Sequence, residues 1–209
     1  MKRAECRLRN KPRPGSFQTM LEILEEPLVR ENVSPISVRF YHEAGAAGMI
    51  SEDVELLEGV IVKKMSKSPL HEFIVARLLR RLSEVLQPGI FAAKERPITT
   101  PDSEPEPDIA VIEGQEDDFF DHHPTTAQLV IEVAVTTLEI DRRKAAIYSR
   151  AGVGEYWIVD AENRTVELFR NPVVETGEYE QKSIFRDGER GDSRIISGFE
   201  IDLGALFDR

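Results

Sequence analysis

Residues 128–135 read QLVIEVAV, an almost continuous apolar run that one carboxylate, Glu132, interrupts. A run of this kind is typical of a strand covered on both faces. Side chains alternate along a strand, so Leu129 and Ile131 are expected to face one side of the sheet, and Val130 and Glu132 the other. An isolated buried charge is costly unless something pairs with it. The sequence therefore implies a partner for Glu132, either a metal ion or a cation.

Asp108 is a second carboxylate placed to meet Glu132. It opens the β-rich run 108–112, directly behind Pro107, and the two carboxylates converge at the sheet surface if their strands are neighbours. Two hard oxygen ligands, with waters completing the shell, suit a magnesium ion. Such an ion can activate water and stabilise a leaving phosphate oxygen. Taken alone, an aspartate after a proline is also typical of a turn.

Lys144 is the third residue that the pattern singles out. The apolar spacing predicts a helix over residues 140–151, in which Lys144 shares a face with Ile147 and Tyr148. A lysine directed at the sheet could offset the charge of Glu132 or stabilise a pentavalent phosphate. The alternative is a buried salt bridge between Glu132 and Lys144 with no metal at all.

The remaining patterns predict an α/β domain with a mixed sheet. Apolar residues recur three and four positions apart over residues 69–86, which predicts a helix. Two β-rich runs, 54–57 and 60–65, flank Glu58-Gly59 and indicate a hairpin. Weaker patterns indicate helices over residues 19–29 and after Ser34, strands over 90–93, 155–159 and 165–169, and shorter strands between 179 and 206.

The first residues differ in composition from the rest. Segment 1–17 combines dense positive charge with Pro12, Pro14 and Gly15, which predicts a flexible basic tail. Residues 18–209 are then expected to form a single domain, because a chain of 209 residues with 41% apolar side chains can bury one substantial core.

Charge and cysteine usage exclude several classes of protein. A net charge of -11 argues against a protein that coats nucleic acid non-specifically. Cys6 is the only cysteine, so one chain can hold neither an internal disulfide framework nor a thiolate zinc cluster. No run approaches the roughly 18 apolar residues of a membrane span, and no secretory signal follows the basic start. The sequence predicts a cytoplasmic protein with no membrane partner.

Pro107-Asp108, Glu132 in an apolar strand and Lys144 on the next helix together resemble the PD-(D/E)XK nuclease superfamily. Within it, residues 128–169, QLVIEVAVTTLEIDRRKAAIYSRAGVGEYWIVDAENRTVELF, are similar to the Uma-two-type restriction endonuclease family of bacteria. So is the upstream stretch VELLEGVIVKKMSKSPLHEFI. The resemblance spans roughly residues 37–205.

This resemblance implies a fold and a site. The fold is a restriction-endonuclease-like core, an α/β arrangement with a mixed β-sheet flanked by helices. Asp108 and Glu132 would be the metal ligands for Mg²⁺ or Mn²⁺, and Glu58 would be a further acidic residue near the site. The superfamily's lysine stands two residues after the glutamate, where this chain has Ala134, so Lys144 would replace it. Many such nucleases are homodimers, because two sites are needed to cut both strands.

Three functions follow as hypotheses. The first is a metal-dependent endonuclease, a hydrolase of phosphodiester bonds in DNA, with Lys63, Lys64, Lys67 and residues 77–81 following the backbone. The second is a catalytically inactive nuclease-fold module that binds nucleic acid or protein. The third is an RNA or nucleotide phosphohydrolase. His71 is a further candidate metal ligand or base, although a histidine that starts a helix more often caps or packs.

Overall fold

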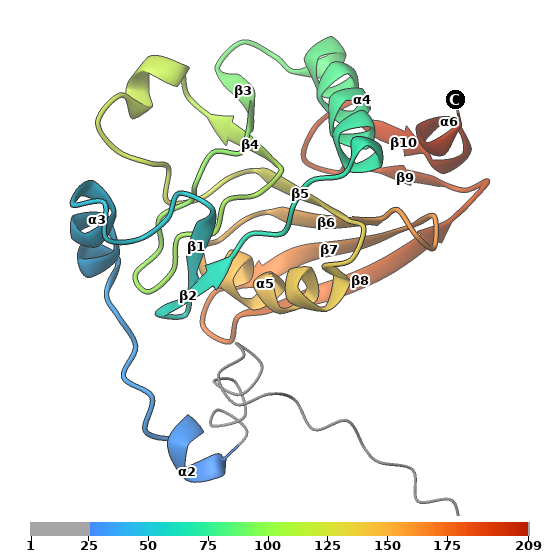
Figure 1. Cartoon of the computed structure of the whole chain (residues 1–209). Helices are drawn as coiled ribbons and strands as arrows, with labels where there is room; N and C mark the ends of the chain where they lie inside the picture. The colour runs from blue at the N-terminus through green and yellow to red at the C-terminus, as the bar shows by residue number, and fades with distance from the viewer. Residues whose placement is uncertain (1–25, 209) are drawn as a thin grey trace, which may run out of the picture. The chain divides into compact units, whose positions relative to one another are not determined.

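The computed structural model describes residues 26–208 of the chain (Figure 1). It divides into two parts, one ending at Pro35 and one beginning at Ile36. In the first part, helix α2 (Pro27–Arg30) is the element described. The predicted basic tail 1–17 lies outside the described residues, as does most of the helix expected over 19–29. The expectation of one domain from residue 18 stays a prediction.

The second part is built on a six-stranded mixed sheet with the order β3-β4-β5-β6-β7-β8. Strands β5 and β6 run parallel, and the other neighbouring pairs are antiparallel. The strands are β3 (Ile90–Lys94), β4 (Ile109–Glu113), β5 (Leu129–Ala134), β6 (Glu155–Asp160), β7 (Thr165–Val173) and β8 (Glu178–Arg186). This arrangement confirms the predicted fold class.

Two helices cover opposite faces of this sheet (Figure 1). Helix α4 (Pro69–Val85) packs on the face that carries Leu129 and Ile131. Helix α5 (Leu138–Arg150) links the parallel strands β5 and β6 and packs on the face that carries Val130. Every residue of β5 is buried, as expected of a strand covered on both sides. Glu132 therefore lies on the face that α5 covers.

A separate hairpin sits beside the main sheet. Strands β1 (Val54–Leu57) and β2 (Val60–Lys63) pair antiparallel, as predicted. Glu58 and Gly59 form the two-residue turn with φ of 49° and 75°, the positive values that such tight hairpins require. A bridge between Leu56 and Glu104 ties β1 to the segment that leads into β4.

Short elements complete the chain. Helix α3 (Val38–Ala46) begins at Ser37, whose hydroxyl accepts a hydrogen bond from the backbone N–H of Phe40, as an N-cap does. The 3₁₀ turn η2 (Glu116–Phe119) lies between β4 and β5. Strands β9 (Arg190–Asp192) and β10 (Glu200–Asp202) pair with each other ahead of helix α6 (Leu203–Phe207). Among the described helices, none combines the length and apolarity that crossing a bilayer needs.

Candidate active site

Asp108 and Glu132 converge where β4 and β5 meet. The register pairs Ile109 with Ile131, which sets the two carboxylates side by side. The backbone N–H of Asp108 donates to Glu132 Oε2 at 3.1 Å, and the N–H of Val133 donates to Asp108 Oδ2 at 2.8 Å. Both side chains are buried. The predicted meeting of the two acids is confirmed, and backbone hydrogen bonds fix their relative position.

Lys144 reaches this pair from helix α5. Its Nζ lies 3.1 Å from Glu132 Oε1, 3.0 Å from Glu55 Oε2 and 4.0 Å from Asp141 Oδ1. The hydroxyl of Tyr148, one turn further along the helix, donates to Glu132 Oε1 at 3.0 Å. Lys144 is 5% exposed. The predicted lysine thus bridges the acids of β1 and β5.

Three carboxylates share the ammonium of Lys144. Burial raises the pKa of Glu132 to about 8, although Lys144 opposes the shift. Burial likewise raises the pKa of Asp141 to about 6, against the pull of Lys144 and a hydrogen bond from Thr137. Burial by itself would lower the pKa of Lys144, but the facing carboxylates outweigh it and the pKa is raised. Burial thus disfavours the charged forms of Glu132 and Asp141, and a further cation would stabilise them.

Asp108 is contacted by a histidine and a lysine. His71, in the first turn of α4, places Nε2 at 2.9 Å from Asp108 Oδ2, and Lys67 places Nζ at 3.4 Å from Asp108 Oδ1. Burial would raise the pKa of Asp108, but the contact with His71 prevails and the pKa is lowered. His71 is therefore placed to orient the carboxylate of Asp108.

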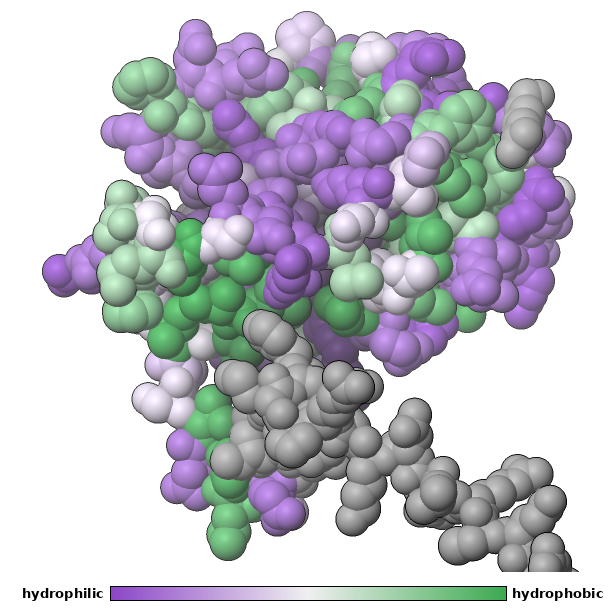
Figure 2. Space-filling view, viewed as in Figure 1, coloured by the Kyte–Doolittle hydropathy of each residue, from purple (hydrophilic) through white to green (hydrophobic). Residues whose placement is uncertain are grey.

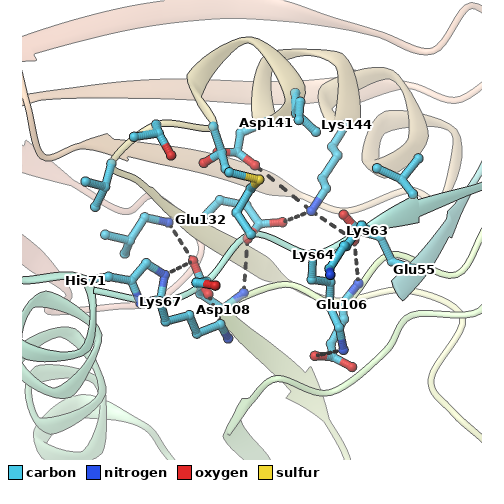
Figure 3. Close-up of a pocket in the computed structure, with 18 of the residues that line it drawn as sticks. Glu55, Lys63, Lys64, Lys67, His71, Glu106, Asp108, Glu132, Asp141 and Lys144 are labelled. Carbon is cyan, nitrogen blue, oxygen red and sulfur yellow. Dashed lines mark hydrogen bonds and ion pairs between the residues drawn. The ribbon is translucent and has the colours of Figure 1, made fainter. Parts of the chain in front are cut away.

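These residues line one pocket of about 180 Å³ (Figure 3). Helix α5 contributes one wall and β1 with β2 another, and His71 and the segment before α4 close the third side. On the face seen in Figure 2, hydrophilic side chains form a band between the hairpin and α4. The ionisable residues that line the pocket are Glu55, Lys63, Lys64, Lys67, His71, Glu106, Asp108, Glu132, Asp141 and Lys144.

Glu58, expected near the site, does not line this pocket. Its side chain is exposed at the turn and pairs with Arg150 at 2.5 Å. Glu55, three residues earlier, is instead the further acidic residue at the site, and the sequence did not predict it. Its Oε2 pairs with Lys144 and also accepts the backbone N–H of Glu106 at 3.2 Å. A strand of only four residues does not reveal which face is buried, so the sequence pattern does not separate Glu55 from an exposed acid.

The arginines of α4 are also used differently from the expectation. Arg77 donates to the backbone carbonyls of Ala205 and Leu206 and lies over the ring of Phe73. Arg81 pairs with Glu84 at 2.9 Å. Arg77 thus contacts the C-terminal helix, and Arg81 pairs within its own helix. Of the basic residues predicted to follow the nucleic-acid backbone, Lys63, Lys64 and Lys67 line the pocket.

The donors fit a hard divalent cation with few protein ligands. Within residues 26–208, no group of three or more histidine, cysteine, aspartate or glutamate side chains is arranged to hold a metal ion. If a metal ion binds, Asp108 and Glu132 would supply two carboxylates and leave the other positions to water, a mode that Mg²⁺ commonly uses. A bound divalent ion would stabilise the charged form of Glu132, which burial disfavours.

The mixed sheet flanked by helices is the arrangement expected of a PD-(D/E)XK-type fold. The chain belongs to the Uma2 family, whose model is described as "Putative restriction endonuclease" and matches residues 50–204.

One solved structure supports the fold. It is described as a "putative nuclease belonging to DUF820" from Anabaena variabilis, and it superposes with a TM-score of 0.66 at 18% sequence identity. The match covers 83% of this chain and 98% of the other. The search of curated proteins found no match.

Proposed function

We propose that this protein is a metal-dependent endonuclease that hydrolyses phosphodiester bonds in DNA. The observation that carries the proposal is that three buried carboxylates, Glu55, Glu132 and Asp141, face one buried lysine, Lys144, while Asp108 meets Glu132 from the next strand in the same pocket. A purely structural ion pair needs one acid for one lysine. Buried acids in excess are costly to a fold unless a cation joins them.

The proposal assigns a role to Asp108, Glu132, Lys144 and His71. Asp108 and Glu132 would hold Mg²⁺ or Mn²⁺, which supplies activated water and charge neutralisation at the phosphate when it is bound. Lys144 holds Glu132 and Glu55 in place and presents positive charge to the phosphate as the P–O bond breaks. His71 fixes the carboxylate of Asp108 from the side of Oδ2.

A catalytically inactive module on the same fold is the second candidate function. The observation that favours it is the 3.1 Å contact between Lys144 and Glu132, which partly neutralises the acid without a metal. Such a module would bind nucleic acid or protein through the same surface and would show no affinity for divalent ions.

The substrate class is tested by cleavage assays on one preparation. Supercoiled, linear duplex and single-stranded DNA, and RNA of the same sequence, are incubated with Mg²⁺, with Mn²⁺ or with EDTA. We expect DNA to be cut only when a divalent ion is present. Cleavage of RNA alone would replace the DNA assignment, and the absence of any cleavage would favour the inactive module.

Glu55 and Glu58 give a direct test of the site's acidic residues. Glu55→Gln should lower the cleavage rate by more than tenfold, because Lys144 loses one of the carboxylates that orient it. Glu58→Ala should leave the rate within about twofold, since this side chain pairs with Arg150 outside the pocket. Initial rates on plasmid DNA measure both variants. A larger loss for Glu58→Ala than for Glu55→Gln would contradict the arrangement described above.

We further propose a homodimer in the cytoplasm, following the family resemblance. Two sites would let one assembly cut both strands. Sedimentation velocity of the full chain measures the assembly state, and a monomer at all concentrations would exclude the dimer.

A further inference from the structure

A closed chain of ionisable side chains surrounds Asp108 at the pocket mouth. Lys67 contacts Asp108 and also pairs with Glu95 at 2.9 Å. Lys94 pairs with Glu95 at 3.0 Å and with Glu72 at 2.7 Å. The chain then returns to Asp108 through His71, whose Nδ1 lies 3.6 Å from Glu72 and whose Nε2 contacts Asp108.

The two oxygens of Asp108 are held differently. Oδ2 accepts a hydrogen bond from the backbone N–H of Val133 and lies 2.9 Å from His71 Nε2. Oδ1 has one polar contact among the described residues, the ammonium of Lys67 at 3.4 Å. Oδ1 is therefore the oxygen that a metal ion can reach, and Lys67 now stands beside it.

Lys67 is less enclosed than Lys144, the buried lysine of the site. Its side chain is 28% exposed, and it comes from the segment that joins β2 to α4 rather than from a helix or strand. Lys144 is 7% exposed at its side chain and is held by two acids. A divalent ion that binds Asp108 repels the nearby ammonium, since like charges a few ångströms apart are strongly unfavourable inside a protein.

We propose that Lys67 is the resident cation beside Asp108 in the metal-free protein, and that it binds a phosphate of the nucleic-acid strand once a divalent ion takes its place. This inference rests on the proposed nuclease function and assigns Lys67 two successive partners. The ammonium keeps Glu95 as a neighbour when it leaves Asp108, and a phosphate oxygen at the pocket mouth replaces the lost carboxylate. Metal and strand would then bind in a favourable order, with the ion first.

The test compares Lys67→Met with a matched control, Lys94→Met. Lys94 also pairs with Glu95 but does not contact Asp108. Calorimetry gives the Mn²⁺ affinity of each full-length protein without nucleic acid. Fluorescence anisotropy in Ca²⁺ gives the affinity for a labelled DNA duplex over a range of salt concentrations. Circular dichroism verifies that each variant is folded, and Lys67→Arg, which keeps the charge, serves as a second variant.

Lys67→Met should bind Mn²⁺ about tenfold more tightly than the wild type, because the competing ammonium is gone. The same variant should bind DNA more weakly, with the slope of log K against log salt reduced by about 1, as the loss of one phosphate contact requires. Lys94→Met and Lys67→Arg should keep the wild-type Mn²⁺ affinity.

Equal or weaker Mn²⁺ binding by Lys67→Met would overturn the inference, and so would equal tightening in Lys94→Met. If the wild type and all variants bind Mn²⁺ equally well, the metal centre of the proposed function stands and the role of Lys67 alone falls. If no variant binds Mn²⁺, the proposed function falls together with this inference.

Discussion

Glu132→Gln should lower metal-dependent DNA cleavage on the order of 10³-fold, because the amide removes one of the two carboxylates proposed to hold the ion. Glutamine has the size of glutamate, and its single amide oxygen can keep one of the two hydrogen bonds that Glu132 accepts, from Tyr148 or from the backbone N–H of Asp108. Lys144 keeps Glu55 as a charged partner at 3.0 Å. We therefore expect a folded protein with a defective site, measured as the initial rate of plasmid cleavage.

Glu139→Gln is the matched control for this change. Glu139 is an exposed carboxylate on α5 that pairs with Arg142 at 2.5 Å and does not line the pocket. This substitution should leave the cleavage rate within about twofold, since an exposed ion pair contributes little to the stability of the fold. Retention of more than a tenth of the wild-type rate by Glu132→Gln would contradict the role given to Glu132.

Lys144→Met should lower the free energy of unfolding by about 3–5 kcal/mol, the usual cost of removing one partner from a buried ion pair. The methionine fills a similar volume, so the loss reports charge rather than packing. Glu55 and Glu132 would be left facing each other without a cation, and both are buried. Urea unfolding of the wild type and the variant measures the difference.

The double variant Lys144→Met with Glu132→Gln separates charge from packing. Removing one of the two facing acids should return part of the lost stability, so the double variant should be more stable than Lys144→Met alone. A loss below about 1 kcal/mol for Lys144→Met would mean that the acids do not depend on this lysine.

The sequence predicted best those elements whose apolar pattern indicates both the type of element and which of its faces is buried. The apolar run of β5 and the periodicity of α4 predicted buried elements, and the structure has them at nearly the same bounds. The same alternation placed Glu132 on the inner face toward Lys144. These inferences succeeded because a buried charge in an apolar element demands a partner, and few candidates existed nearby in the chain.

The contribution of Glu55 could not be predicted in this way. A four-residue strand does not reveal which face is buried, and the isolated hairpin is set against the pocket by contacts with a segment about fifty residues away. Glu58 lies in the two-residue turn of this hairpin, where its side chain is exposed and meets Arg150, a residue far along the chain. Likewise, the hydrogen bonds of Arg77 depend on where the C-terminal helix packs.

The most direct test of the metal centre is calorimetric titration of the wild-type protein with Mn²⁺, set beside Glu132→Gln and Glu139→Gln in the absence of nucleic acid. We predict saturable binding by the wild type and by Glu139→Gln, and at least a tenfold weaker affinity for Glu132→Gln. Equal Mn²⁺ binding by all three proteins, or none by the wild type at millimolar concentration, would contradict a metal site built on Asp108 and Glu132.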